Sequence, residues 1–238
     1  MRLGPGKVEN CVFHLPLLSP FAIFEEDRMR LGPGKVENCV FHLPLLSPFI
    51  IFVSNKEDNM IYNERDTRKE VVCEAAKQIM MAARTAPKGK GVDIIEIATV
   101  TGDDLLALAR RMREESEKRD MKFFLRDAGN IEQSDAVILI GTRRQVQGLN
   151  CAYCGYKTCT ENPQENPCAI NSIDVGIAIG SACSKAADLR IDTRVMFSAG
   201  AAAQEMELLP GCRQVIALAL SVSSKSPYFD RKPQTPKA

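Results

Sequence analysis

Four cysteines lie close together in this 238-residue sequence, with the spacing C-x2-C-x4-C-x8-C: Cys151, Cys154, Cys159 and Cys168. Four thiolates from one short segment can surround a single inorganic centre, so the segment is predicted to be a loop that binds a metal or cluster. The chain is too large and, at 26% charged residues, too polar to need disulfide bonds for stability. The cysteines therefore indicate a metal site in a reducing compartment.

Two kinds of metal site fit this spacing. A cuboidal 4Fe–4S cluster takes one thiolate at each of four corners and accepts an electron with little change in geometry. Gly155 follows the second cysteine, where its backbone can approach a cluster and its N–H can bond a sulfur. Zinc is the alternative, although all-cysteine zinc sites usually contain a second C-x2-C pair, which this chain lacks. We favour 4Fe–4S, and this interpretation requires the four sulfur atoms to converge.

The composition excludes several other classes of function. The 31 Lys and Arg residues against 30 Asp and Glu leave a net charge of +1, so no basic surface for nucleic acid or an anionic membrane is expected. Aromatic residues make up only 6% of the chain and Trp is absent, which disfavours stacking on nucleic-acid bases. His14 and His42 are the only histidines, so a histidine-based site is excluded from the rest of the sequence.

The N-terminal part of the chain contains an unchanged internal repeat, because residues 1–21 recur at 29–49. Structural repeats diverge, since only their packing positions are constrained. We expect residues 1–59 to be a poorly packed extension from a recent duplication, from an expression vector or from translated upstream DNA, and residues 60–238 to be the domain. The apolar runs of the extension are too short to span a membrane and are followed by no small-residue cleavage site. We therefore expect a cytoplasmic protein.

Hydrophobic periodicity in the domain predicts interleaved helices and strands. A helix ending before Pro87 is expected to lead into a glycine-rich basic turn, Lys88-Gly-Lys-Gly91, and then a strand. Interleaved elements of this kind indicate the α/β or α+β class. The sequence predicts helices over 68–86, 102–119, 171–189 and 193–208, and strands over 92–100, 123–125, 135–141 and 214–222.

The cysteine segment resembles a known iron–sulfur motif. Residues 149–159, LNCAYCGYKTC, are similar to the motif D/N-C-G-x-C-G-x-x-T-C of the corrinoid iron–sulfur protein, with Ala152 in place of the first glycine. Residues 60–231 resemble a bacterial and archaeal family of uncharacterised proteins containing a ferredoxin domain. That resemblance rests on AARTAPKGKG, the cysteine loop, DVGIAIGS and FDR. It implies a 4Fe–4S cluster held by a loop over residues 149–170.

A second resemblance is to the nitroreductases. Residues 82–88, AARTAPK, followed by VTG at 100–102 are similar to the nitroreductase pattern A-A-x-x-A-P-S-x-x-N…V-T-G. That family is an α+β dimer that holds FMN at the subunit interface. The resemblance implies an α+β fold with a nitroreductase-like sheet flanked by helices, an inserted cysteine-rich loop, a homodimer and bound FMN. Lys88 and Gly91 stand where that family has a flavin-contacting serine and an asparagine. Because lysines beside flexible glycines can hold a phosphate, we expect cofactor contacts from Arg84, Lys88, Lys90 and Gly91, and the alternative is a solvated basic turn.

These observations predict an iron–sulfur oxidoreductase that transfers single electrons through its cluster. A flavin, a redox partner protein or a small-molecule acceptor would exchange those electrons, and no catalytic acid–base pair is identified. Neither nucleic acid nor membrane is expected as a partner. The alternatives are a non-enzymatic iron–sulfur sensor and a zinc-stabilised interaction module.

Overall fold

The computed structural model describes residues 61–229, and the expectations for residues 1–59 lie outside this range. Helices and strands are interleaved, which confirms the predicted α+β class. In chain order the elements are α1 (Glu64–Thr85), the 3₁₀ turn η1 (Gly89–Gly91), β1 (Ile95–Val100), α2 (Asp103–Arg119), α3 (Phe123–Glu132), β2 (Ala136–Arg143), α4 (Ala169–Asp188), β3 (Asp192–Met196), α5 (Phe197–Glu205) and β4 (Cys212–Ser221).

The four strands form one antiparallel sheet in the order β1-β2-β4-β3. The central strand β2 pairs with β1 on one side and β4 on the other, and all but its last residue is buried. This agrees with the expectation that the apolar run over 135–141 is a strand buried on both faces. Because β2 lies at the centre of the sheet, its carboxyl end can present the following loop from a rigid support.

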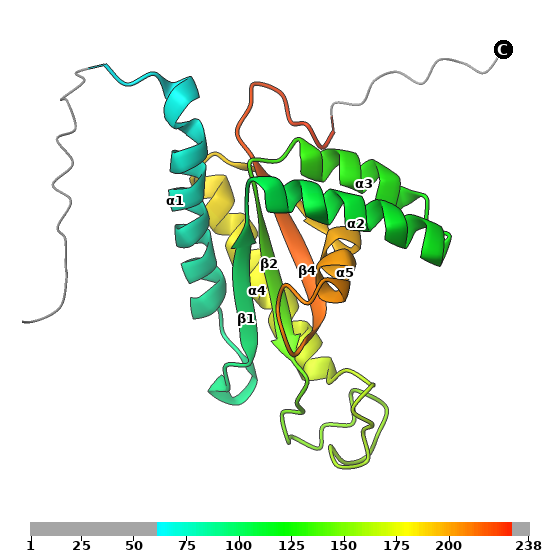
Figure 1. Ribbon diagram of the computed structural model, residues 1–238. Helices are drawn as coiled ribbons and strands as arrows, with labels where there is room; N and C mark the ends of the chain where they lie inside the picture. The colour runs from blue at the N-terminus through cyan, green and yellow to red at the C-terminus, as the bar shows by residue number, and fades with distance from the viewer. Residues whose placement is uncertain (1–60, 230–238) are drawn as a thin grey trace, which may run out of the picture. The chain divides into compact units, whose positions relative to one another are not determined.

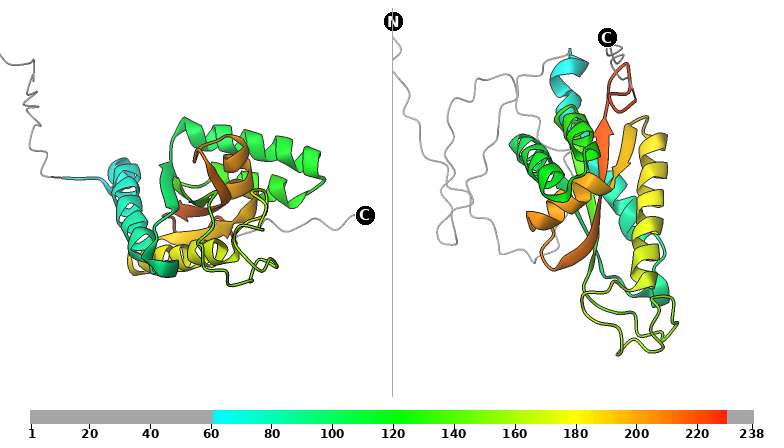
Figure 2. Two further views of the ribbon diagram at one scale, coloured as in Figure 1. Left: turned by 90° about the horizontal axis from the view of Figure 1, so that it is seen from below. Right: turned by 90° about the vertical axis from the view of Figure 1, so that its right-hand side faces the viewer.

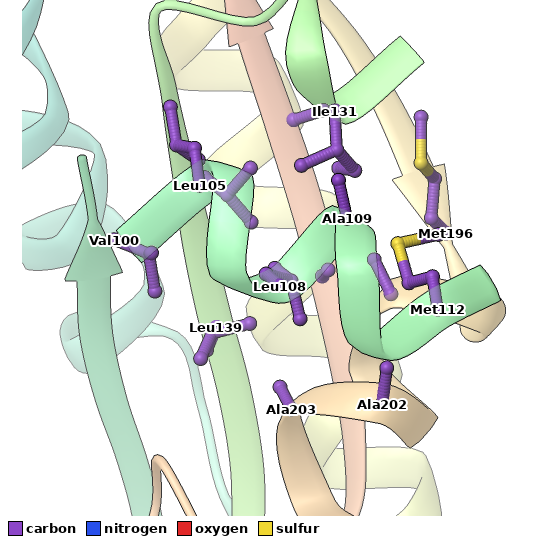
Figure 3. Close-up of a cluster of buried hydrophobic side chains, with 14 of the residues drawn as sticks. Val100, Leu105, Leu108, Ala109, Met112, Ile131, Leu139, Met196, Ala202 and Ala203 are labelled. Atoms are coloured by element: carbon purple, nitrogen blue, oxygen red, sulfur yellow. The ribbon is translucent and has the colours of Figure 1, made fainter. Parts of the chain in front are cut away.

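Helices cover both faces of the sheet (Figures 1 and 2). The pair α1 and α4 packs on one face, and α2, α3 and α5 pack on the other. Neighbouring residues of β2 serve different cores. Ile138 belongs to the core under α1 and α4, whereas Leu139 belongs to the core under α2, where it lies beside Leu108 (Figure 3). Successive side chains of a strand point to opposite faces, and this alternation joins the two helical layers into one domain.

The predicted helices α1, α2 and α4 are all present. Helix α1 begins earlier than expected because Asn63 caps it, its Oδ1 accepting a hydrogen bond of 3.0 Å from the Arg65 N–H. Helix α4 buries one face in the core and exposes Ile173 and Ile177 on the other. Within residues 61–229, no helix is long and apolar enough to cross a membrane.

The strand predicted over residues 123–125 was wrong, because these residues begin helix α3. Phe124 is fully buried, and Ala128 and Ile131 follow it at helical spacing in the same core. The aromatic pair at positions 123 and 124 suits a strand locally, but packing against α2 determines the helix.

The helix predicted over residues 193–208 was wrong in its first part. Residues Asp192–Met196 form the edge strand β3, which pairs with β4 from Asp192↔Ser221 to Met196↔Ala217. Pairing with β4 outweighs the weak preference of these residues for a helix. The alanine-rich remainder forms α5 as expected.

Candidate functional site

The four motif cysteines lie in an irregular segment between the end of β2 and the start of α4 (Figure 1). Cys168 is buried and is the N-cap residue of α4, whereas Cys151, Cys154 and Cys159 are half-buried. All four are free thiols. Residues 149–168 therefore form a loop, as predicted, whereas the last two residues of the predicted range, 169 and 170, already belong to α4.

Tight turns shape the loop backbone. Asn150, Ala152 and Gly155 have left-handed conformations, with φ of 51°, 59° and 92°. The Gly155 N–H donates to the Ala152 carbonyl at 2.9 Å, so it does not make the sulfur contact expected for it. Asn150 makes that contact instead, because its N–H donates to the Cys159 Sγ at 3.3 Å while its Oδ1 accepts from the Cys159 N–H at 2.8 Å. An N–H directed at a sulfur stabilises the thiolate that a metal requires.

The thiols converge only in part. Cys159 and Cys168 line one cavity, and Cys151 and Cys154 do not line it. Among residues 61–229, no three His, Cys, Asp or Glu side chains gather closely enough to hold one metal ion. Four thiolates around a single zinc would stand about 4 Å apart, given Zn–S bonds of ~2.3 Å. The convergence of all four sulfur atoms stays a prediction.

The glycine-rich turn lies beside the start of the cysteine loop. The Gly89 N–H donates to both carboxylate oxygens of the buried Asp174 in α4, at 3.0 and 3.1 Å. The Lys90 ammonium donates to the Gln147 carbonyl at 3.1 Å. These contacts join three segments that are far apart in the sequence, and they hold the first residues of the loop against α4.

Lys88 closes the C-terminal end of α1. Its ammonium donates to the carbonyls of residues 83, 84 and 86, which the helix end leaves without backbone partners. Burial lowers the pKa of the Lys88 ammonium, although the carboxylates of Asp93 and Asp174 oppose this shift. In this structure the Lys88 charge therefore stabilises a helix end.

The other predicted cofactor residues are also engaged within the chain. The Arg84 guanidinium pairs with Asp93 at 2.7 Å and donates to the Ile95 carbonyl at 2.6 Å, which joins the end of α1 to the start of β1. Gly91 has a left-handed φ of 67° that closes the turn. Each cation of the turn already contacts a group of this chain, so none is left to bind a flavin phosphate. Contact between the turn and a flavin therefore stays a prediction.

A cavity of about 310 Å³ opens beside Cys159 and Cys168. It lies where the end of β2, the cysteine loop, the first turn of α4 and the start of β4 meet, and no Asp or Glu lines it. Sequence analysis missed its polar residues, although Arg143 ends the buried strand β2 and Arg144 directly follows it, which signals a site at the strand end. The polar side chains of the wall include Arg143, Arg144, Asn171, Arg213 and Gln214.

Solved structures of an oxidoreductase and of nitroreductases resemble this fold. The hypothetical oxidoreductase YcnD from Bacillus subtilis is 22% identical, with 68% of this chain and 61% of that chain covered and a TM-score of 0.42. The chain thus spans less than two thirds of that protein. A nitroreductase with bound FMN from Bacteroides fragilis is 14% identical, with 69% and 83% covered and a TM-score of 0.46. An FMN-dependent nitroreductase from Clostridium difficile is 15% identical, with 68% and 80% covered and a TM-score of 0.43.

Sequence comparison establishes the family. An uncharacterized protein of Archaeoglobus fulgidus is 40% identical over 185 residues, which cover 74% of this chain and 100% of the relative. Residues 164–231, which include the fourth cysteine, match the family model described as "Uncharacterized protein containing a ferredoxin domain (DUF2148)". The chain therefore belongs to this family of proteins that contain a ferredoxin domain, as its sequence predicted.

Proposed function

We propose that this protein is an iron–sulfur redox protein whose four loop cysteines hold a 4Fe–4S cluster and through which single electrons pass. The observation that carries the proposal is that all four motif thiols are free and lie in one irregular loop, framed by rigid elements at both ends. Soft thiolate donors without histidine or carboxylate partners suit iron–sulfur clusters. When bound, the cluster supplies a one-electron store whose potential depends on nearby hydrogen bonds and charge.

Two features of the loop suit sulfur atoms that are bound to a metal and carry negative charge. Asn150 directs its N–H at the Cys159 sulfur and fixes the neighbouring backbone through its side chain. Cys168 lies at the N-terminus of α4, where no acidic residue occupies the first turn and no side chain caps the helix. The positive end of the helix dipole and its free N–H groups therefore lie close to a thiolate. Both features stabilise the negative charge of a ligated sulfur.

The alternative of a zinc-stabilised interaction module receives less support from the same geometry. The described thiols do not gather around a common point as a single ion requires. A cluster, in contrast, separates its ligands by its own metal and sulfide atoms, so its cysteines need not approach each other as closely. Binding of either group would still require Cys151 and Cys154 to join Cys159 and Cys168.

The flavin part of the proposal rests on the sequence similarity of residues 82–102 to nitroreductases. The turn cations Arg84, Lys88 and Lys90 already contact groups of this chain, so we derive no electron-transfer step through a flavin. The test is direct. Denaturing the protein after purification should release about one FMN per chain if flavin belongs to the site, and none in a sensor without flavin.

Metal analysis of the full chain, purified without oxygen, tests the cluster. We expect about four iron and four sulfide per chain, with broad visible absorption that dithionite bleaches. Cys159→Ser should lose most of the iron. The matched control is Cys73→Ser, which changes a free, half-buried cysteine on α1. This variant should retain its iron. Zinc without iron in the unmodified chain would refute the proposal.

A further inference from the structure

Buried polar side chains join the two ends of the cysteine loop. Asn171 and Asp174 lie three residues apart on α4, and so on one face of the helix, and both are buried. The Asn171 amide donates to the Gln145 carbonyl in the segment that leaves β2. Two residues further along this segment, the buried side-chain amide of Gln147 donates to the Asp174 carboxylate at 3.5 Å. The start of the loop is therefore attached at two points to the helix that follows the loop.

The Asp174 carboxylate is buried and is held by N–H groups. The side chain is 3% exposed, and its donors are the Gly89 N–H, at 3.0 and 3.1 Å from the two oxygens, and the Gln147 amide. A buried carboxylate is costly, and an apolar side chain would pack at such a place at a lower cost. Both donors come from the glycine-rich turn and the start of the loop. What the carboxylate adds is therefore a fixed position for these two segments.

These contacts lie close to the first and the last thiol of the motif. Cys151 follows Gln147 by four residues, and Cys168, the N-cap residue of α4, precedes Asn171 by three. Asp174 lies six residues after Cys168, which is about 9 Å along the helix axis. Bringing the ends of a flexible loop together costs chain entropy, and the folded chain already holds these ends together (Figure 1). Cys151 and Cys168 are thereby kept at one end of the domain before any metal binds.

We propose that Asp174 and Asn171 are positioning residues of the cluster site, which join the two ends of the loop and so hold Cys151 and Cys168 within reach of one centre. The inference rests on the proposed function, because the centre that these thiols reach is the cluster. A residue that only stabilised the fold would protect all buried cysteines alike. A positioning residue protects the thiols of the loop above the others, and this difference can be measured.

Alkylation of the full, metal-free chain by iodoacetamide, followed by mass spectrometry, tests the proposal. Cys168 is buried in the loop and Cys212 is buried in β4, so the ratio of their rates compares opening of the loop with opening of the sheet. Asp174→Ala should raise this ratio about tenfold, since the loop then loses hydrogen bonds to a charged group. Circular dichroism reports whether the variant folds. If it does not fold, Gln147→Ala removes only the contact at the start of the loop and should raise the ratio about threefold.

The conservative variant Asp174→Asn should restore the protection of Cys168. Its amide keeps an oxygen for the Gly89 N–H. Its new N–H₂ group can donate to Gln147 Oε1, which has no partner among residues 61–229, once the Gln147 amide turns over. The ratio of the two rates should then stay within about twofold of that in the unmodified chain.

The matched control is Asp127→Ala in α3. Asp127 is also a buried carboxylate, at 4% exposed, and it accepts a hydrogen bond of 2.6 Å from Ser198 Oγ, but it lies on the opposite face of the sheet. This variant should be less stable and yet leave the ratio unchanged. The proposal is overturned if neither Asp174→Ala nor Gln147→Ala raises the ratio, if Asp127→Ala raises it equally, or if Asp174→Asn raises it as much as Asp174→Ala.

Iron analysis of the same proteins, purified without oxygen, separates this inference from the proposed function. An unmodified chain without iron, whose variants still show the expected ratios, would retain the joined loop ends and refute the redox centre. A full iron content together with equal ratios in Asp174→Ala and the unmodified chain would refute the positioning role alone.

Discussion

At the scale of the residue, the backbone of the cysteine loop decides which side chains it tolerates. Ala152 has a φ of 59°, a left-handed conformation in which its Cβ crowds the following carbonyl. The similar iron–sulfur motif has glycine at this position, and the conformation supplies the physical reason. The loop thus stores strain next to its first two predicted ligands.

Ala152→Gly should raise the free energy of unfolding by about 1 kcal/mol, because glycine adopts a positive φ without steric strain. Urea denaturation of the metal-free chain measures the change. As a control, Ala107→Gly in the middle of α2 should lower stability by about 1 kcal/mol. Equal destabilisation by both substitutions would show that Ala152 carries no strain.

Tyr228 gives the protein a predictable response to alkali. Its side chain is buried, with its hydroxyl 3.2 Å from Ser134 Oγ, and burial raises the pKa of the phenol far above its usual value of about 10. Above pH ~10 the unfolded chain releases this proton while the folded chain keeps it. The free energy of unfolding should therefore fall by up to ~1.4 kcal/mol per pH unit.

Comparison with Tyr228→Phe isolates this contribution. The variant should be less stable by about 1 kcal/mol at pH 8, because it loses the hydrogen bond to Ser134. Its stability should then fall less steeply between pH 10 and 12 than that of the unmodified chain. Parallel curves for the two proteins would show that Tyr228 ionises equally well in the folded state.

At the scale of the element, close approach of α5 to the sheet fixes one layer of the domain. A Cβ added at Gly200 would lie 2.0 Å from the Val215 carbonyl oxygen of β4. Only glycine allows the helix to approach the strand backbone so closely. This contact holds α5 against the sheet, and the adjoining start of β4 contributes Arg213 to the cavity.

Gly200→Ala should lower the free energy of unfolding by about 3 kcal/mol or more, since α5 must move away from β4. Gly129 in α3 provides the matched control because a Cβ there meets no atom within 4 Å. Gly129→Ala should stabilise the protein by up to about 1 kcal/mol through helix propensity. Thermal and urea unfolding measure both variants, and a mild effect at Gly200 would contradict the close contact.

At the scale of the whole molecule, the predicted homodimer stays a prediction, and helix α4 offers a face on which to test it. Ile173 and Ile177 are exposed at 48% and 39%, beside Gly176 and Gly180, where an added Cβ would meet no other atom. Small and apolar residues on an outer helix face allow close packing of a second copy.

Light scattering after gel filtration should give twice the chain mass if this face forms the dimer. Ile177→Glu should then shift the protein to the monomer, because the carboxylate would be buried without a partner. Leu125→Glu is the control, since Leu125 is 50% exposed on α3 at the opposite face of the sheet. A dimer that survives Ile177→Glu would place the interface elsewhere.

The sequence by itself determined the features that depend on short-range patterns. The spacing of Cys151, Cys154, Cys159 and Cys168 predicted a ligand-bearing loop, and periodic apolar residues predicted three of the helices and the central strand. Family membership followed from the same segments. These features are local, because a period or a spacing is readable without knowing what the segment packs against.

Only the tertiary structure decided the contacts between distant segments. Residues 192–196 are a strand because they pair with β4, and the Lys88 ammonium serves the end of α1 rather than remaining free. Likewise, Arg144, Asn171 and Arg213 come from three different parts of the chain and meet at one cavity. Such contacts depend on how the helices and strands pack, and no local pattern records the partner that a side chain will find.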